Sequence, residues 1–249
     1  MNEIMKIRNL TKIYGKKEVR TTVLNNISLD IKEGDFIAVM GPSGAGKSTL
    51  LNLLSTIDKP THGSIELDGQ ELTSIRNEKL AKLRKEHIGF IFQDYNLLDN
   101  MTLMDNIALP LSLSNMEPKE IEQRVRKMAV LFHLEQHLKK YPHQLSGGQK
   151  QRGAAARALI RNPRILFADE PTGALDSKSS RELLVSLKKI NEESNATILM
   201  VTHDAFCASY ARQVYMLKDG EIFTTLHADE DRHVFYEHIL QLLASMGGD

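Results

Sequence analysis

The sequence predicts an α/β fold built on a mostly parallel sheet. Apolar runs at residues 36–40, 88–92, 164–170 and 197–203 are typical of strands buried on both faces, although the last two end in polar residues. Segments with apolar residues at helical spacing separate these runs. Strands that alternate with helices indicate a mostly parallel sheet.

The remaining elements of the first third follow in order. Residues 24–31 (LNNISLDI) and 63–70 (GSIELDGQ) alternate apolar and polar positions, which predicts half-buried strands, the second with a turn at Asp68–Gly69. The segment STLLNLLS, from Ser48, predicts a helix after the first buried run. A charged helical pattern then begins at about Asn77.

Residues of about 95–160 form a different region. They contain no strong strand pattern, and a helical pattern starts at Pro118, so we expect a helical insert. Beyond the insert, residues 180–190 predict a helix between two buried strands. Residues 214–223 predict a hairpin that turns at Asp219–Gly220.

An amphipathic helix is predicted for residues 231–244. Phe235, Ile239 and Leu242 lie on one face at helical spacing, which favours packing on the chain's own domain over docking to a partner. The methionines between about 101 and 128 either face a groove for a partner helix or fill gaps in the core.

Composition restricts the classes of function. The chain has 249 residues with 32 basic and 32 acidic side chains, a formal net charge of +0. This balance lacks the basic bias of a general nucleic-acid binder, so no nucleic-acid partner is expected. The single cysteine, Cys207, excludes an internal disulfide and fits a reducing, cytoplasmic compartment, where we expect it to be a small packed residue. No signal segment and no run of about 18 apolar residues is found, so we expect that the chain does not itself span a membrane.

A glycine-rich loop follows the first buried strand. Residues 41–49 (GPSGAGKST) fit the P-loop pattern, in which backbone N–H groups surround phosphate oxygens, Lys47 reaches the outer phosphates and the Ser48 hydroxyl binds Mg²⁺. A simple glycine-rich turn is the alternative, and the strand–loop–helix context argues against it. The candidate nucleotide-binding residues are Gly41, Ser43, Gly44, Ala45, Gly46, Lys47, Ser48 and Thr49.

Two carboxylates end the third buried run. Asp169 and Glu170 come at the carboxyl end of the strand, where ligands bind in open α/β sheets. We expect Asp169 to hold Mg²⁺ and Glu170, which points to the other side, to position or deprotonate a water molecule. The alternative is a strand that ends in a solvated polar turn.

A second possible phosphate site lies about a hundred residues after the P-loop. In HQLSGGQKQR (residues 143–152), Gly147 and Gly148 stand just before a helical run. Because glycine costs a helix about 1 kcal/mol, the pair needs a reason, and a helix start with small residues is a natural anion site.

The P-loop, LSGGQ and ILFADEPTGALD together resemble the nucleotide-binding subunit of ATP-binding cassette (ABC) transporters, over about residues 4–227. The resemblance implies an ABC ATPase domain of residues 1–227, with a P-loop NTPase core of the RecA type at about 1–94 and 160–227. It also implies an N-terminal antiparallel β region and a helical subdomain at about 95–159. Residues 228–249 would be a C-terminal amphipathic helix extension.

The resemblance also implies roles for single residues. Tyr14 would stack on adenine, Gln93 would touch Mg²⁺ and the attacking water and report to the membrane subunit, Asp176 would contact the other subunit and His203 would contact the γ-phosphate. Each has a simpler interpretation: a rim aromatic for Tyr14, polar strand-end residues for Gln93 and His203, and a helix N-cap for Asp176. Gly173 is a small departure, because many relatives carry another residue before Ala-Leu-Asp.

The resemblance implies a function for the glycine pair. In the family, the LSGGQ segment of one subunit covers the ATP bound to the P-loop of another, with Mg²⁺. The implied contacts come from Ser146, Gly147, Gly148 and Gln149, with Ser146 and Gly148 donating to the γ-phosphate. One complete set of motifs in the chain implies a homodimer.

Within the family, the sequence resembles the branch of macrolide exporters, lipoprotein-releasing ATPases and antimicrobial-peptide resistance ATPases. FIFQDYNLLD, SGGQKQR and the tail DRHVFYEHIL are most similar to the bacitracin-type resistance group. That implies an integral-membrane permease with a large extracellular domain, a place on the cytoplasmic face of the cell membrane, and a sensor histidine kinase nearby. The alternatives are a lipoprotein-release or macrolide-export subunit and, from another class, a non-transport ABC ATPase of DNA repair or translation.

One further pattern remains. His133 and His137 are spaced to share one helix face, which is a possible half of a metal site. No third ligand is evident, so we expect both histidines to face solvent.

Overall fold

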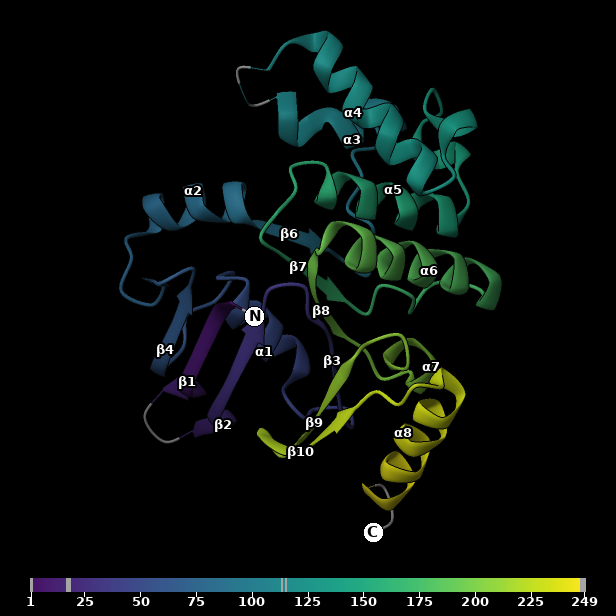
Figure 1. Ribbon diagram of the computed structural model, residues 1–249. Coiled ribbons are helices and arrows are strands. Elements are labelled where there is room, and N and C mark those ends of the chain that lie inside the picture. Colours follow the sequence, from purple (N-terminus) through teal and green to yellow (C-terminus); the bar gives the residue numbers. More distant parts are fainter. Residues whose placement is uncertain (1, 17–18, 113, 115, 247–249) are drawn as a thin grey trace.

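A computed structural model describes residues 2–16, 19–112, 114 and 116–246 (Figure 1). Its larger sheet has the strand order β10-β9-β3-β8-β7-β6. The strands are β3 (Phe36–Met40), β6 (Ile88–Ile91), β7 (Ile165–Asp169), β8 (Thr197–Val201), β9 (Gln213–Lys218) and β10 (Glu221–His227). From β9 to β6 all neighbours pair in parallel, and β10 pairs antiparallel with β9. The expected parallel sheet and the hairpin are thus confirmed.

A smaller antiparallel sheet has the order β2-β1-β4-β5. Its strands are β1 (Glu3–Lys16), β2 (Val19–Lys32), β4 (His62–Leu67) and β5 (Gln70–Glu71). The sequence pattern marked residues 24–31 of β2, missed the start of that strand and did not indicate β1. The reason is that register shifts, one of them between Ile7 and Leu10, break the two-residue period on which strand prediction depends.

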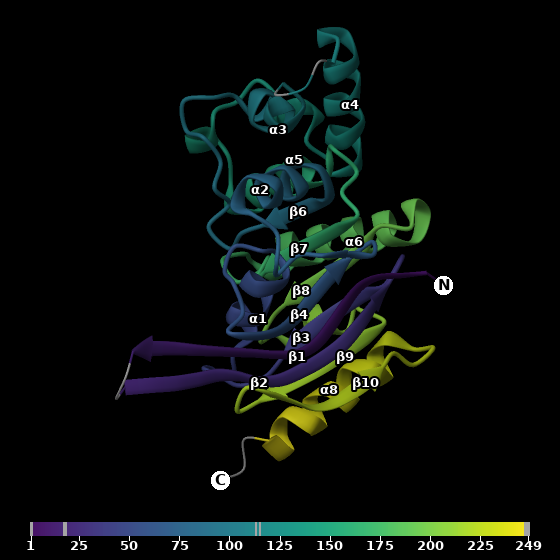
Figure 2. The same cartoon turned by 90° about the vertical axis from the view of Figure 1, so that its left-hand side faces the viewer.

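Helices cover both faces of the larger sheet. They are α1 (Lys47–Leu54), α2 (Asn77–His87), α3 (Leu103–Ser112), α4 (Pro118–Leu131), α5 (Gly147–Leu159), α6 (Ser177–Ser194), α7 (Ala205–Ala208) and α8 (Arg232–Met246), with 3₁₀ turns η1 (Glu135–His137) and η2 (Pro142–Gln144). The elements from α3 to α5 form the expected helical insert between β6 and β7. Figure 2 shows α3 and α4 at one end of the molecule, far from α8. None of the helices in the described ranges is both long and apolar enough to cross a membrane.

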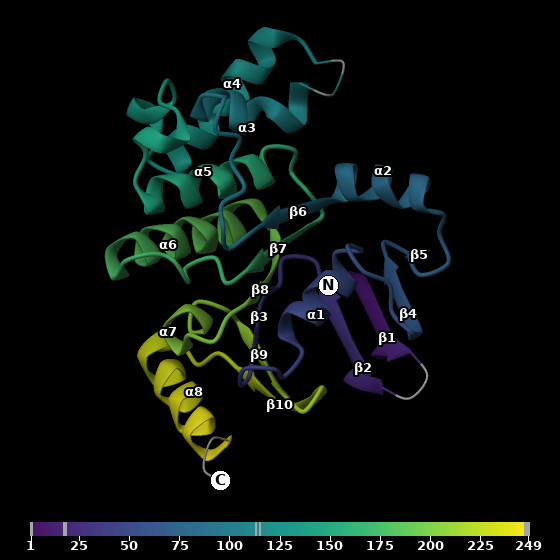
Figure 3. The ribbon, with the colours of Figure 1, turned by 180° about the vertical axis from the view of Figure 1, so that it is seen from behind.

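The two faces of β3 belong to two cores. Phe36, Ala38 and Met40 pack with the helical insert, α6 and α8, whereas Ile37 and Val39 pack with α1 and the smaller sheet. Figure 3 shows these groups on opposite sides of the sheet. Every residue of β3 is therefore buried, which explains its continuous apolar sequence.

The C-terminal helix packs on its own chain, as expected. Phe235 and Ile239 are 1% and 0% exposed, and Leu242 packs against the same core. The Arg232 guanidinium lies over the rings of Phe206 and Tyr210, at 5.3 and 4.6 Å from their centroids. Residues 247–249 of the predicted 228–249 extension lie outside the described residues, and the domain boundaries given above stay predictions.

The prediction that His133 and His137 share one helix face is wrong. Helix α4 ends at Leu131, and His133 has a left-handed backbone with φ +55°. This conformation ends the helical run, so His137 falls in the separate turn η1. His133 is exposed, but His137 is only half-exposed and contacts α5. The described residues contain no group of three or more His, Cys, Asp or Glu side chains that could hold a metal ion.

Candidate active site

The P-loop joins β3 to α1 by backbone geometry that only glycine tolerates. Gly41 has φ +150°, and a Cβ there would lie 2.1 Å from the carbonyl oxygen of Leu217. Gly46 has φ +97°, and a Cβ there would lie 2.8 Å from the carbonyl oxygen of Val23. Among the described residues, no side chain caps the start of α1. The loop therefore presents free N–H groups at a helix N-terminus, which suits an anion.

Lys47 is the first residue of α1, and its side chain extends back over this loop. Its Nζ donates to the carbonyl oxygens of Gly41 and Pro42, both at 2.9 Å. Burial lowers the pKa of Lys47, and the nearby charges of Glu170 and Asp169 oppose that effect. A cavity of about 560 Å³ opens beside Lys47. Its lining consists of Gly41, Pro42, Ser43, Lys47, Glu170, His203, Leu243 and Met246.

Ser48 and Asp169 supply oxygen atoms suited to Mg²⁺. The Ser48 hydroxyl lies 3.4 Å from Asp169 Oδ1, although the two residues are 121 positions apart. Burial and then the charge of Glu170 raise the pKa of Asp169. A hydroxyl and a carboxylate are the two protein ligands that P-loop enzymes use for Mg²⁺, with phosphate oxygens as further ligands. The residues present therefore fit this ion.

Glu170 turns away from Asp169 toward a histidine. Its φ of +44° is left-handed, and its N–H donates to the carbonyl oxygen of Val201 at 2.9 Å. Its Oε2 lies 2.9 Å from His203 Nδ1. The Glu170 side chain is 15% exposed and that of His203 is 69% exposed. Because β7 and β8 are adjacent and parallel, their carboxyl ends bring this pair to the edge of the P-loop cavity.

Gln93 lies beside the turn that follows Glu170. A Cβ added to Gly173 would lie 3.3 Å from the amide nitrogen of Gln93 and 3.6 Å from the Cβ of Glu170. Gln93 is exposed. The structure thus brings Gln93 close to Glu170, and the small residue at position 173 keeps space between them.

Tyr14 lies near Thr49 at the start of α1 and is not among the residues that line the cavity beside Lys47. It is 43% exposed, and its hydroxyl donates to Asp58 Oδ2 at 2.8 Å. Lys12 Nζ lies 4.7 Å from the ring centroid and 2.8 Å from Asp58. Burial and then Asp58 raise the pKa of Tyr14, and a hydrogen bond with Thr49 opposes them. Sequence reasoning missed Lys12 and Asp58, although Lys12 precedes Tyr14 by two strand positions and so shares its face.

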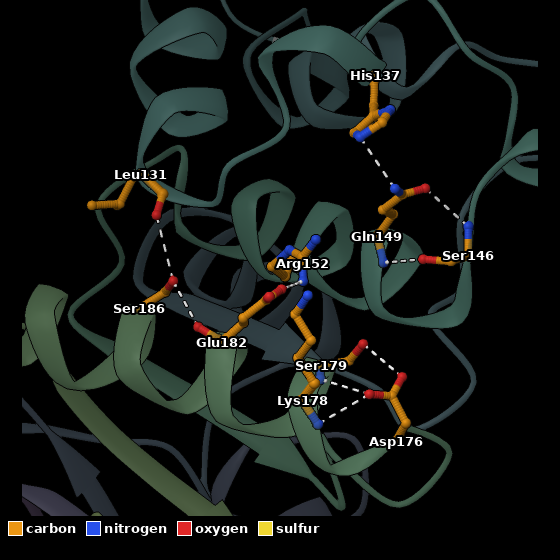
Figure 4. Close-up of polar contacts among 10 residues, drawn as sticks. All are labelled: Leu131, His137, Ser146, Gln149, Arg152, Asp176, Lys178, Ser179, Glu182 and Ser186. Carbon is orange, nitrogen blue, oxygen red and sulfur yellow. Dashed lines mark hydrogen bonds and ion pairs between the residues drawn. The ribbon is translucent and has the colours of Figure 1, made fainter.

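The LSGGQ segment (residues 145–149) forms a capped helix start. Ser146 Oγ accepts the Gln149 N–H at 3.3 Å, and Gln149 Oε1 accepts the Ser146 N–H at 3.0 Å (Figure 4). This reciprocal pair is a capping box. A Cβ on Gly148 would lie 2.4 Å from Ser179 Oγ, and one on Gly147 would lie 3.0 Å from the Tyr95 hydroxyl. The glycine pair therefore lets α5 begin in contact with α6.

Asp176 is the N-cap of α6, which confirms the simpler interpretation of this residue. Its Oδ1 accepts the N–H groups of Lys178 and Ser179 at 3.0 and 2.9 Å, and its Oδ2 accepts the Ser179 hydroxyl at 2.8 Å. The hydrogen bonds that Ser179 donates are the main reason why the pKa of Asp176 is lowered. An ion pair between Arg152 and Glu182 also joins α5 to α6 (Figure 4).

Replacing Asp176 with alanine is expected to lower the melting temperature by about 2–4 °C, because α6 loses its N-cap. The measurement is a thermal unfolding scan. Asp176→Asn is the matched control, since asparagine caps equally well without the charge. Equal melting temperatures for Asp176→Ala and the unchanged chain would contradict the capping role.

The two candidate phosphate sites are separate within one chain. No residue of the LSGGQ segment lines the cavity beside Lys47. Two residues of α8, Leu243 and Met246, do line it, and sequence reasoning missed them. Their spacing of three positions placed them on one helix face, but nothing in the sequence indicated that this face ends at the P-loop.

Comparisons with a family model, with known proteins and with solved structures each find proteins similar to this chain. The family model described as "ABC transporter" matches residues 24–173. The chain is 48% identical over 246 residues to "Bacitracin export ATP-binding protein BceA" of Halalkalibacterium halodurans, covering 98% of this chain and 97% of that protein. It is 44% identical to "Macrolide export ATP-binding/permease protein MacB" of Syntrophobacter fumaroxidans, covering 88% of this chain and 31% of that protein. A solved dimer of the ATP-binding cassette MJ0796, bound to ADP and Pi, superposes with a TM-score of 0.84 at 40% identity over 92% of this chain and 100% of that chain.

Proposed function

This chain belongs to the ABC transporter family, and we propose that it is the ATP-hydrolysing subunit of a permease that removes or detoxifies bacitracin-type peptide antibiotics and signals their presence. It is an ATPase that converts ATP and water to ADP and phosphate and uses Mg²⁺. The observation that carries the proposal is the cavity in which Lys47, Glu170 and His203 meet. The likeness to BceA over nearly the whole chain supports the peptide-antibiotic role.

The residues have distinct roles in the proposed hydrolysis. The P-loop N–H groups and Lys47 bind the outer phosphates, and Ser48 and Asp169 hold Mg²⁺. Bound Mg²⁺ offsets charge on the phosphate oxygens. The water oxygen forms a bond to the γ-phosphorus while the bond from that phosphorus to the bridging oxygen breaks, so ADP leaves with the bridging oxygen and Glu170 accepts the proton of the water. His203 Nδ1 donates to the Glu170 carboxylate, which leaves Nε2 as the ring nitrogen that faces the γ-phosphate.

The remaining motif residues complete the proposed site. The exposed ring of Tyr14 would stack on adenine, and Gln93, from its place beside Glu170, would contact Mg²⁺ and the water. Two copies of the chain associate so that Ser146–Gln149 of each cover the ATP of the other, with Asp176 at the contact. The separation of the LSGGQ segment from the chain's own cavity supports this arrangement, and MJ0796 is a dimer.

The permease is proposed to contact a groove of about 370 Å³ between β6 and α3. The groove has a mixed lining, in which the apolar residues Phe90, Phe92, Leu109 and Pro110 lie beside the charged residues Lys85, Glu86, Arg157 and Arg161. Phe92 immediately precedes Gln93, so a partner here acts directly on the active site. Binding there places the chain at the cytoplasmic face of the membrane. The permease carries a large extracellular domain and works beside a sensor histidine kinase.

The test is to tag the chain in its native host, solubilise membranes gently and identify what co-purifies. We expect a permease with a large extracellular domain, and ATPase activity of the complex that rises several-fold with bacitracin but not with a macrolide. A complex with Glu170→Gln is the control for contaminating ATPases. Stimulation by macrolides instead would favour the export role suggested by the likeness to MacB. Recovery of only ribosomal or DNA-repair proteins would contradict the transport role.

A further inference from the structure

The amide of Gln149 is held at both ends. Its Oε1 accepts the Ser146 N–H at 3.0 Å, and its Nε2 lies 3.1 Å from His137 Nε2 (Figure 4). An amide oxygen only accepts and an amide nitrogen only donates, so the bond to Ser146 determines which end faces the histidine. His137 Nε2 is therefore an acceptor, and the proton of the neutral ring is on Nδ1.

The position of His137 is unusual for a residue without a function. Its Nδ1 is buried and has no hydrogen-bond partner among the described residues. A buried polar atom without a partner is unfavourable, and an apolar residue would avoid it. The turn η1 supports the ring, because the N–H of His137 donates to the carbonyl oxygen of Leu134 and its carbonyl oxygen accepts the N–H of Lys140, both at 2.9 Å.

We propose that His137 is a positioning residue for ATP hydrolysis: its unprotonated Nε2 orients the Gln149 amide, which closes the capping box on Ser146 and shapes the helix start that a second copy presents to ATP. The inference rests on the proposed function, because it requires that the LSGGQ segment contacts the nucleotide of a partner. It adds a residue from outside the motif to the machinery. Its chemical requirement is an acceptor at the Nε2 position, which glutamine supplies with Oε1 and phenylalanine does not.

Acid is expected to release this contact. A protonated His137 would present an N–H to the Gln149 amide N–H₂, so neither nitrogen could accept. Burial lowers the pKa of His137, as do Lys140 and Arg152, whereas Glu135 on the same turn raises it. At pH 7 the ring is thus neutral. Because the unfolded chain binds the proton more readily, stability falls as pH drops below about 6.5, the ordinary histidine value, toward the lowered folded value.

The first experiment is hydrogen–deuterium exchange on the full chain. At pH 7.5, His137→Phe is expected to speed exchange of the peptide containing residues 145–149, because the Ser146 N–H loses its oriented acceptor. His137→Gln should keep the slow exchange of the unchanged protein. His133→Asn is the matched control, since His133 is an exposed neighbour and asparagine tolerates its left-handed backbone. Equal exchange for His137→Phe and the control would overturn the inference, whatever the protein does with ATP.

The second experiment measures ATP-driven dimerisation by light scattering, with Glu170→Gln as the parent. Adding His137→Phe is expected to raise the ATP concentration at half-dimerisation about tenfold, as each of two sites loses one hydrogen bond. Lowering pH stepwise from 7.5 to below 6.5 should weaken the parent by a larger factor than the same protein with His137→Gln. Dimerisation by the His137→Phe protein at the parent's ATP concentration would overturn the positioning role, whereas a parent that never dimerises would contradict the proposed function.

Discussion

Replacing Glu170 with glutamine is expected to reduce ATP turnover by about 10²- to 10⁴-fold, the usual contribution of a general base, and to leave Mg-ATP binding intact. Glutamine has the same shape and can keep the contact with His203 that Glu170 makes at 2.9 Å. It cannot take up a proton from water. The substitution leaves Lys47, Ser48 and Asp169 unchanged, and these are the residues proposed to hold the nucleotide and Mg²⁺. The measurements are phosphate release at steady state and binding of a fluorescent ATP analogue.

The same substitution should trap the closed state. With hydrolysis stopped, ATP stays between the two copies, so light scattering should show a dimer mass at saturating Mg-ATP and a monomer mass without it. Adding Lys47→Ala is the control, because it removes the ammonium group that is proposed to reach the phosphates. A monomer mass at saturating Mg-ATP would count against the dimer, and near-normal turnover would refute the role of Glu170.

Replacing Gly148 with alanine is expected to abolish ATP-driven dimerisation and to lower the free energy of unfolding by about 1–3 kcal/mol. The new Cβ would lie 2.4 Å from Ser179 Oγ and 2.7 Å from Ser179 Cβ. Ser179 cannot yield easily, because its N–H and hydroxyl both bond to Asp176. The start of α5 must therefore move, and with it Ser146. Urea unfolding and light scattering in the Glu170→Gln background measure the two effects.

A double variant separates packing from phosphate contact at Gly148. Ser179→Gly removes both crowded atoms. The double variant that combines Gly148→Ala with Ser179→Gly should therefore be about as stable as the single variant Ser179→Gly. Recovery of the dimer as well would assign the defect to packing between α5 and α6. Recovery of stability without the dimer would assign it to the approach of the partner's ATP. Full dimerisation by Gly148→Ala without any second change would contradict the proposed contact.

Much of the molecule was predictable because its signals are local. The continuous apolar sequence of β3 reflects burial on both faces, and Pro118 marked the start of α4. Local signals failed where the backbone departs from a regular period. The shifts between Ile7 and Leu10 hid β1, and the left-handed His133 separated His137 from the helix that the pattern had extended to it.

By itself, the sequence determined the type of fold, the P-loop, the place of the two carboxylates and the existence of a second glycine-based helix start. These depend on side-chain period and on conformations that only certain residues adopt. Tertiary structure alone decided that Glu170 meets His203, that the end of α8 borders the P-loop cavity and that His137 contacts Gln149. Such contacts join residues from different elements, and their geometry depends on how strands pair and helices pack rather than on any nearby pattern.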